Sequence, residues 1–277
     1  MFASIYLDAA TVGVYVARIT AVDDALDTIT VSLTAKSGTI PADGANGRTI
    51  KVGGAWKGPN AAENFPVGFV TSAQTNASGD IPRVNFKSGT TYNITAGLIA
   101  NKDGPIRWQG YTTTVNDGGR ATIDGGTTGA SYKLWSSANH DQDLEDFIFQ
   151  NNGATGGVSG VEITGTEWNI HRVVVNSVRG TGIDILGSIT MVSECEAYSC
   201  NQSIGSELGG ISLSGSGGLL GIRCISHDNT GSNSIGYRVG GFAALVHCIA
   251  DSNTLDGFFV KPSTGACLIG CDAYNNG

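Results

Sequence analysis

Four similar phrases in the C-terminal half of the chain indicate its fold: CEAYSCN from Cys195, CISHDNT from Cys224, CIADSNT from Cys248 and CDAYNNG from Cys271. The four leading cysteines follow one another at intervals of 29, 24 and 23 residues. Two earlier copies are FIFQNNG from Phe147 and VVVNSVR from Val173. A phrase that recurs at this spacing predicts a stack of similar coils.

Aligned on their leading residue, the copies share columns of similar chemistry. The leading column and the column two residues later are apolar or small, and the column three residues earlier is mostly aliphatic. The column five residues later is mostly Asn: Asn152, Val178, Cys200, Asn229, Asn253 and Asn276. We predict that the leading cysteines point inward, because a free thiol packs as a small hydrophobe.

A second phrase follows the first in five copies and reads Gly, apolar, variable, apolar. The copies are GVEITG from Gly160, GIDILG from Gly182, GISLSG from Gly210, GYRVGG from Gly236 and GFFVKP from Gly257. Alternation with a period of two predicts a short strand with one buried face. One coil of such strands cannot bury its own apolar face, so the coils must stack into a β-solenoid.

The Asn at the turn, followed by Gly and an apolar-x-apolar strand, resembles the right-handed parallel β-helix of the pectin-lyase-like superfamily. The resemblance extends from about Val84 to Gly277. It implies an all-β fold, a right-handed parallel β-helix, here preceded by a small N-terminal antiparallel β element. Lyases, hydrolases, phage tailspikes and passive adhesins share that fold, so it does not specify an activity. The Ca²⁺-binding Asp residues and the catalytic Arg of pectate lyases have no residue-by-residue match here.

The sequence predicts three parts. Residues 1–59 hold the alternating segments VYVARITAV, DTITVSLTA and NGRTIKVGG, which predict an antiparallel β module for attachment or capping. Residues 60–80 are expected to be a capping segment or a linker, because the first coil of a solenoid exposes an unpaired strand edge. Residues 81–277 form the β-helix, whose last coil stops in mid-phrase.

The composition and net charge of the chain limit the kinds of partner that it can bind. Gly accounts for 41 of 277 residues and only 14% are charged, against about 25% in an average protein, which suits a solenoid with many turns and a neutral polar surface. The net charge of −8 argues against nucleic-acid binding. No apolar run is long enough for a membrane span, and the chain shows no signal peptide. We expect an extracellular or virion location.

One outward column is the candidate ligand-binding site. It lies three residues after the leading column and holds Gln150, Asn176, Tyr198, His227, Asp251 and Tyr274. Ligand sites combine aromatic surfaces with a few placed polar groups, as a sugar requires. The last four residues are therefore the candidates for a glycan-binding strip, and a solvated face without a ligand is the alternative.

The candidate catalytic residues are Glu162 and Asp184, which occupy equivalent outward positions in consecutive second phrases. Carboxylates about 5 Å apart suit a retaining glycosidase, and their repulsion would raise one pKa. A bound cation and ordinary surface carboxylates are the alternatives. The acidic segment Ser136–Asp146 is expected to be a solvated loop, with bound Ca²⁺ as the alternative. No other cofactor and no metal site are predicted.

Two further expectations concern charge and redox state. The column one residue before the leading column is predicted to be an exposed ion-pair ladder: Asp146, Arg172, Glu194, Arg223 and His247. The six cysteines are expected to be reduced, because neighbouring ladder side chains point in parallel and a disulfide between them would be strained.

The sequence predicts a structural, surface-exposed β-helix protein, a virion appendage or an extracellular adhesin that binds cell-surface glycans. A polysaccharide lyase or glycoside hydrolase on the same fold is the alternative. Expected partners are glycans and further copies of the chain, in a homotrimer or a larger particle.

Overall fold

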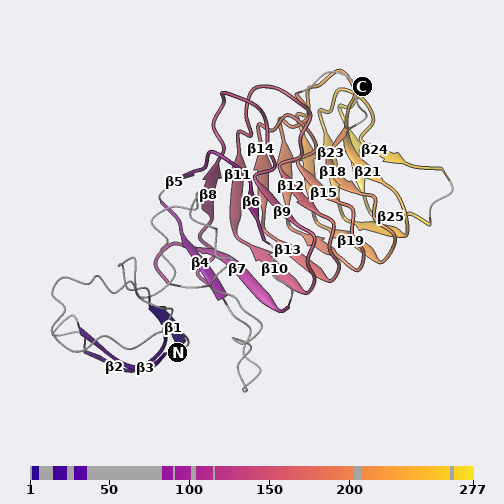
Figure 1. Ribbon diagram of the computed structural model, residues 1–277. Coiled ribbons are helices and arrows are strands. Elements are labelled where there is room, and N and C mark those ends of the chain that lie inside the picture. The colour runs from indigo at the N-terminus through magenta and orange to yellow at the C-terminus, as the bar shows by residue number, and fades with distance from the viewer. Residues whose placement is uncertain are drawn as a thin grey trace. The chain divides into compact units, whose positions relative to one another are not determined.

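Figure 1 shows the computed structural model of the protein. The structure describes residues 2–5, 15–23, 28–35 and 83–277, the last range with gaps at 90, 101–103, 115, 203–207 and 263–264. The chain divides into two compact units, Met1–Ala55 and Trp56–Gly277. The predicted capping segment 60–80 and the predicted strand in NGRTIKVGG lie outside the described residues.

The first unit contains a three-stranded antiparallel sheet in the order β1 (Phe2–Ile5), β2 (Tyr15–Asp23), β3 (Thr28–Ala35). β2 and β3 are the two alternating segments that the sequence predicted, and a β-bulge interrupts their pairing between Ile19 and Ala21. β1 was not expected from the sequence. The small antiparallel β element is therefore present.

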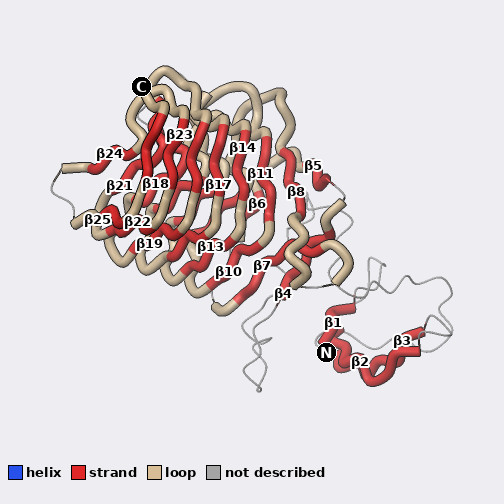
Figure 2. Tube along the Cα trace, turned by 180° about the vertical axis from the view of Figure 1, so that it is seen from behind, coloured by secondary structure: helices blue, strands red, loops and turns tan. Residues whose placement is uncertain are grey.

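The second unit is built from three parallel sheets that run along one stack of coils (Figures 1 and 2). Sheet 1 contains β4 (Arg83–Lys87), β7 (Ile106–Tyr111), β10 (Gln142–Glu145), β13 (Trp168–His171), β16 (Met191–Ser193), β19 (Leu219–Ile222), β22 (Ala243–Val246) and β25 (Cys267–Ile269). Sheet 2 contains β5 (Thr91–Asn93), β8 (Ala121–Asp124), β11 (Phe147–Gln150), β14 (Val174–Asn176), β17 (Glu196–Tyr198), β20 (Ile225–His227), β23 (Ile249–Asp251) and β26 (Asp272–Tyr274).

Sheet 3 contains β6 (Leu98–Ile99), β9 (Trp135–Ser137), β12 (Val161–Ile163), β15 (Ile183–Ile185), β18 (Leu208–Leu213), β21 (Ser234–Val239) and β24 (Phe258–Val260). Each strand pairs in parallel with the equivalent strand of the next coil, for example β12 with β15. None of the described residues is helical. The predicted right-handed parallel β-helix is confirmed.

From the third coil onward, starting with β10, each short junction between a sheet 1 strand and the following sheet 2 strand contains one residue with a left-handed backbone conformation. These residues have φ between 49° and 62°: Asp146, Arg172, Glu194, Arg223, His247 and Gly270. The turn shifts the in-out alternation of the strand by one residue. As a result, Leu144, Phe147 and Phe149 are all fully buried.

The inward columns that the sequence predicted form the core. The leading column is buried from Phe147 to Cys248 and half-buried at Cys271, in the last coil. Aromatic rings fill the first coils, where Trp108 and Trp135 meet edge to face with centroids 5.1 Å apart. Small side chains replace them in later coils, and the stacked rings of Tyr237 and Phe258 fill the space on the sheet 3 side.

The Asn column forms a hydrogen-bonded ladder at the turn after sheet 2. The Asn229 amide donates to Asn253 Oδ1 at 2.6 Å, and Asn253 donates to Asn276 Oδ1 at 2.9 Å. Asn229 Oδ1 also accepts the backbone N–H of Cys200, in the coil before, at 2.9 Å. Each amide therefore satisfies turn backbone groups that no strand can pair.

All six cysteines are free, and Cys195, Cys200, Cys224 and Cys248 are buried. The Cys224 thiol donates to the carbonyl oxygens of Val192 at 3.3 Å and Ile222 at 3.4 Å. Burial raises the pKa of the Cys200 thiol to about 12. The ladder cysteines Cys195, Cys224 and Cys248 are core residues, as predicted.

Two predictions about acidic residues are wrong. Asp146 is fully buried rather than exposed, because Arg172 covers it and binds both of its carboxylate oxygens, at 2.8 and 2.7 Å. The segment Ser136–Asp146 is not a solvated loop, because it holds the end of β9 and all of β10, and Gln142 and Leu144 are buried. The alternation of charge does produce ion pairs, here and between Arg223 and Glu194.

Replacing Cys248 by Asp tests the inward ladder. The free energy of unfolding should fall by about 3 kcal/mol or more, because the new carboxylate would be buried without a partner. His247→Asp is the matched control: His247 is exposed and has φ 52°, a backbone conformation that Asp tolerates, so stability should hardly change. Equal losses in chemical denaturation would contradict the register.

Candidate functional site

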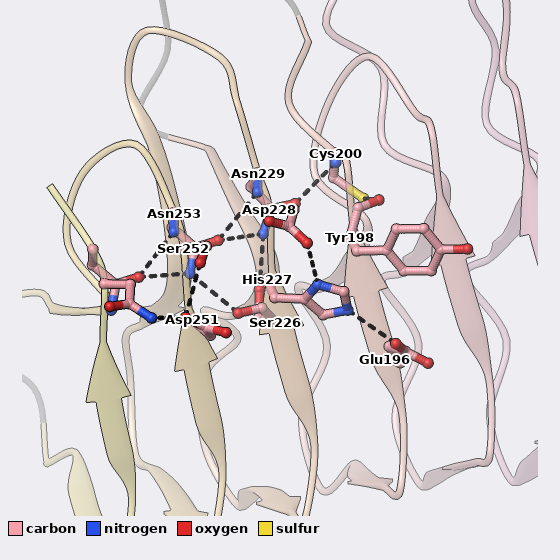
Figure 3. A network of polar contacts seen from close by, with 12 residues as sticks. Glu196, Tyr198, Cys200, Ser226, His227, Asp228, Asn229, Asp251, Ser252 and Asn253 are labelled. Atoms are coloured by element: carbon pink, nitrogen blue, oxygen red, sulfur yellow. Dashed lines mark hydrogen bonds and ion pairs between the residues drawn. The ribbon is translucent and has the colours of Figure 1, made fainter.

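The predicted ligand column lies on the outer face of sheet 2. Strand pairing places Tyr198 opposite His227, His227 opposite Asp251, and Asp251 opposite Tyr274. The four predicted residues therefore stand on consecutive strands, and Figure 3 shows the first three. Asn176 precedes Tyr198 in the same column but is buried, so it separates half-buried Gln150 from the four predicted residues.

The rings of Tyr198 and His227 form the centre of the site. They stack with their centroids 5.1 Å apart and their planes 15° from parallel. The imidazole lies between two carboxylates: Nε2 is 2.9 Å from Glu196 Oε1, and Nδ1 is 2.7 Å from Asp228 Oδ2 (Figure 3). A protonated imidazole donates from both nitrogens and can satisfy both carboxylates at once.

The environment of His227 favours its charged form. Burial lowers the pKa of the imidazole, but the hydrogen bonds to Glu196 and Asp228 outweigh burial, and the pKa is raised above its ordinary value. Sequence reasoning missed both carboxylates as site residues. Glu196 lies two residues before Tyr198 on the same face of β17, so the period of two held a usable signal.

The strip continues toward the last coil with a more open, polar surface. Asp251 Oδ1 accepts hydrogen bonds from the Ser252 hydroxyl at 2.9 Å and the Asn275 amide at 3.1 Å. Tyr274 is 46% exposed. The core supports this region from beneath, since Ser226, the inward neighbour of His227, is fully buried and accepts from the Asn229 amide.

The two candidate catalytic residues stand side by side on the outer face of sheet 3, where Glu162 pairs with Asp184 across β12 and β15. Lys133 Nζ lies 2.5 Å from Glu162 Oε1. The Ser159 hydroxyl is 3.3 Å from Asp184 Oδ2. Burial is the main reason that the pKa of Asp184 is raised, and the negative charge of Glu162 adds to the rise. The expected repulsion therefore contributes but does not dominate.

A hollow of about 180 Å³ lies next to Glu162. Its lining comes from the two preceding coils and the same coil, and includes Ile99, Lys133, Ser136 and Thr164. Ser212, which follows Asp184 in the outer column, is buried. The open side of the carboxylate pair therefore faces the N-terminal coils.

Within the described ranges, no group of three or more His, Cys, Asp or Glu side chains has an arrangement that could hold a metal ion. A search of the same residues finds no helix with the length and apolar character of a membrane span.

Replacing His227 by Gln should remove a pH-dependent part of the stability. Because the folded pKa is raised, this contribution is complete below the unfolded value of about 6.5 and is lost as the pH rises through the folded pKa. We expect the free energy of unfolding to fall by up to about 1 kcal/mol near pH 5.5 and by much less near pH 9.

The matched control is His247→Gln. His247 is exposed and forms no ion pair with any of the described residues. Urea denaturation of the three proteins across this pH range provides the measurement. If His227→Gln lowers the free energy of unfolding equally at pH 5.5 and pH 9, the proposed role of the two carboxylates is contradicted.

Comparison with known proteins supports the fold and leaves activity open. No family model and no curated protein matches the chain. Among solved structures, pectate lyase Pel9A is similar with a TM-score of 0.54 and 18% identity, over 81% of this chain and 68% of that chain. A pectin methylesterase from Aspergillus niger matches with a TM-score of 0.46 and 11% identity, over 72% of this chain and 80% of that chain. The chain has the pectin-lyase-like right-handed parallel β-helix fold.

Proposed function

We propose that this protein is a structural, surface-exposed β-helix protein that binds glycans on the outer face of sheet 2. The observation that carries the proposal is the parallel ring pair of Tyr198 and His227, with hydrogen-bonding groups in the neighbouring rows. Aromatic surface with a few fixed polar groups is the usual composition of a small-ligand site. A sugar ring fits it, because it has apolar C–H faces and a rim of hydroxyl groups.

The charge of this face favours a neutral glycan. The imidazolium of His227 is the positive group in the strip, whereas Glu196, Asp228 and Asp251 lie around it with carboxylates. Asp272, on the last strand of sheet 2, adds a further exposed acid. A polyuronate would be repelled by this surface, whereas the hydroxyl groups of a neutral polysaccharide would donate hydrogen bonds to the carboxylates.

The proposed setting is a virion appendage or an extracellular adhesin. A stack in which each coil is hydrogen-bonded to the next presents its side chains at fixed spacing and loses little conformational entropy when it binds. The separate N-terminal unit is the proposed point of attachment.

Tyr198→Ala should weaken binding to a neutral polysaccharide about tenfold, because a lost ring contact of about 1.4 kcal/mol corresponds to that ratio. Tyr111→Ala, which removes a half-buried tyrosine from sheet 1, is the matched control and should bind as the wild type does. The measurement is affinity electrophoresis against a panel of neutral and acidic polysaccharides. Wild-type protein that binds none of them, or unchanged binding by Tyr198→Ala, would overturn the proposal.

A second candidate function, glycoside hydrolysis, rests on the carboxylate pair of sheet 3. Asp184 has a raised pKa while Glu162 lies against Lys133, and two carboxyl groups in different electrostatic environments are what an acid and its partner require. If this function operates, wild-type protein will release reducing ends from a polysaccharide, and Glu162→Gln and Asp184→Asn will each abolish the release. Release of sugars by the wild type would replace the non-enzymatic proposal.

A further inference from the structure

The outer face of sheet 1 changes character along the stack. In coils three and four, which contain β10 and β13, its outward side chains are polar or charged: Asp141, Asp143, Glu145, Glu167, Asn169 and His171. In the four coils that follow, nine outward residues form what we call the apolar strip: Ile189, Met191, Leu220, Ile222, Phe242, Ala244, Val246, Cys267 and Ile269. Figure 2 shows the corresponding strands β19, β22 and β25 following one another.

The apolar strip is open to solvent. Ile189, Phe242 and Ile269 are 60, 70 and 52% exposed. The nine side chains together present on the order of 600 Å² of apolar surface, equal to the largest patch of a typical monomer and most of the roughly 800 Å² that each partner gives to a standard interface. Surface of this size and composition suits an interface with a partner.

Nothing in the coil geometry requires this composition. Ile189 has a left-handed φ of 51°, a conformation that is rare for a β-branched residue. Asp141 and Glu167 occupy the same conformation in earlier coils, and Gly218 does so in the next coil. A polar residue or Gly therefore serves the turn, and the exposed isoleucine requires another explanation.

We infer that the apolar strip binds a second copy of this chain. Two copies of one strip have the same spacing between rows, about 4.8 Å, so each side-chain row of one copy can lie against a row of the other along the whole contact. The apolar area available is most of what each partner contributes to a standard interface. This inference concerns a different sheet from the proposed glycan strip and does not depend on it.

Charge selects the orientation of the two copies. If the two stacks ran in parallel, exposed acidic residues of both copies would face one another, among them Asp141 and Glu167. If they run antiparallel about a twofold axis along the strand direction, only the apolar strips overlap and the acidic parts lie apart. The apolar strips of the two copies then run in opposite directions, and the row of Met191 in one copy lies opposite the row of Cys267 in the other.

Sedimentation velocity across a wide range of protein concentration tests the inference. The wild type should form a dimer. The double variant Phe242→Glu/Ile269→Glu should be a folded monomer, with the thermal stability of the wild-type monomer. Ile99→Glu is the matched control, because Ile99 is 57% exposed but lies on sheet 3, and it should remain dimeric. A monomeric wild type, or a dimer that survives the double substitution, would overturn the inference.

Disulfide formation between the two copies tests their antiparallel orientation. Oxidised glutathione accepts the two electrons released when two thiols form the disulfide. Met191→Cys should yield a covalent dimer through Cys267 of the second copy, and Met191→Cys with Cys267→Ser should not. In the antiparallel pair the two Cys267 residues are about three coils apart, beyond the reach of a disulfide. A covalent wild-type dimer through Cys267 would contradict the antiparallel arrangement.

Discussion

The pairing of each coil with the next is the constraint on which the rest of this structure depends. Parallel strands fix which residues stand in one column, and a shift of one residue would exchange the buried and exposed faces. The Asn229–Asn253–Asn276 ladder holds that register at the turn, because each amide bonds both to its neighbour and to turn backbone. The buried column from Phe147 to Cys248 then follows from the same register.

Each outer face gains its own chemistry from this arrangement. On sheet 2 the register stacks Tyr198 on His227 and brings Glu196 of the preceding coil to the imidazole. On sheet 3 it sets Glu162 beside Asp184, and burial distinguishes the two carboxyl groups. On sheet 1 it gathers apolar residues from four coils. Residues far apart in the chain become neighbours through stacking alone, without a loop to position them.

The repeated phrases were sufficient to predict the fold and the columns, because a strand has a period of two and every copy keeps the same spacing within its phrase. The phrases were insufficient to predict the backbone conformation of the turns. Residues such as Arg172 and Glu194 adopt left-handed conformations that no local propensity favours, and the stack imposes them. The burial of Asp146 escaped prediction because it depends on how Arg172 folds over it. The carboxylates that hold His227 escaped for the same reason, since side-chain contacts between coils depend on rotamers as well as register.

Reactivity of the six cysteines toward a thiol reagent in the native state tests the register most directly. The account predicts that Cys267, which is exposed, reacts first, and that half-buried Cys271 follows. Cys195, Cys200, Cys224 and Cys248 should react only at the rate of unfolding, because they are buried and the pKa of the Cys200 thiol is raised. Prompt reaction of any of these four in the folded protein would contradict the inward ladder, and with it the placement of Tyr198, His227, Asp251 and Tyr274 on the outer face.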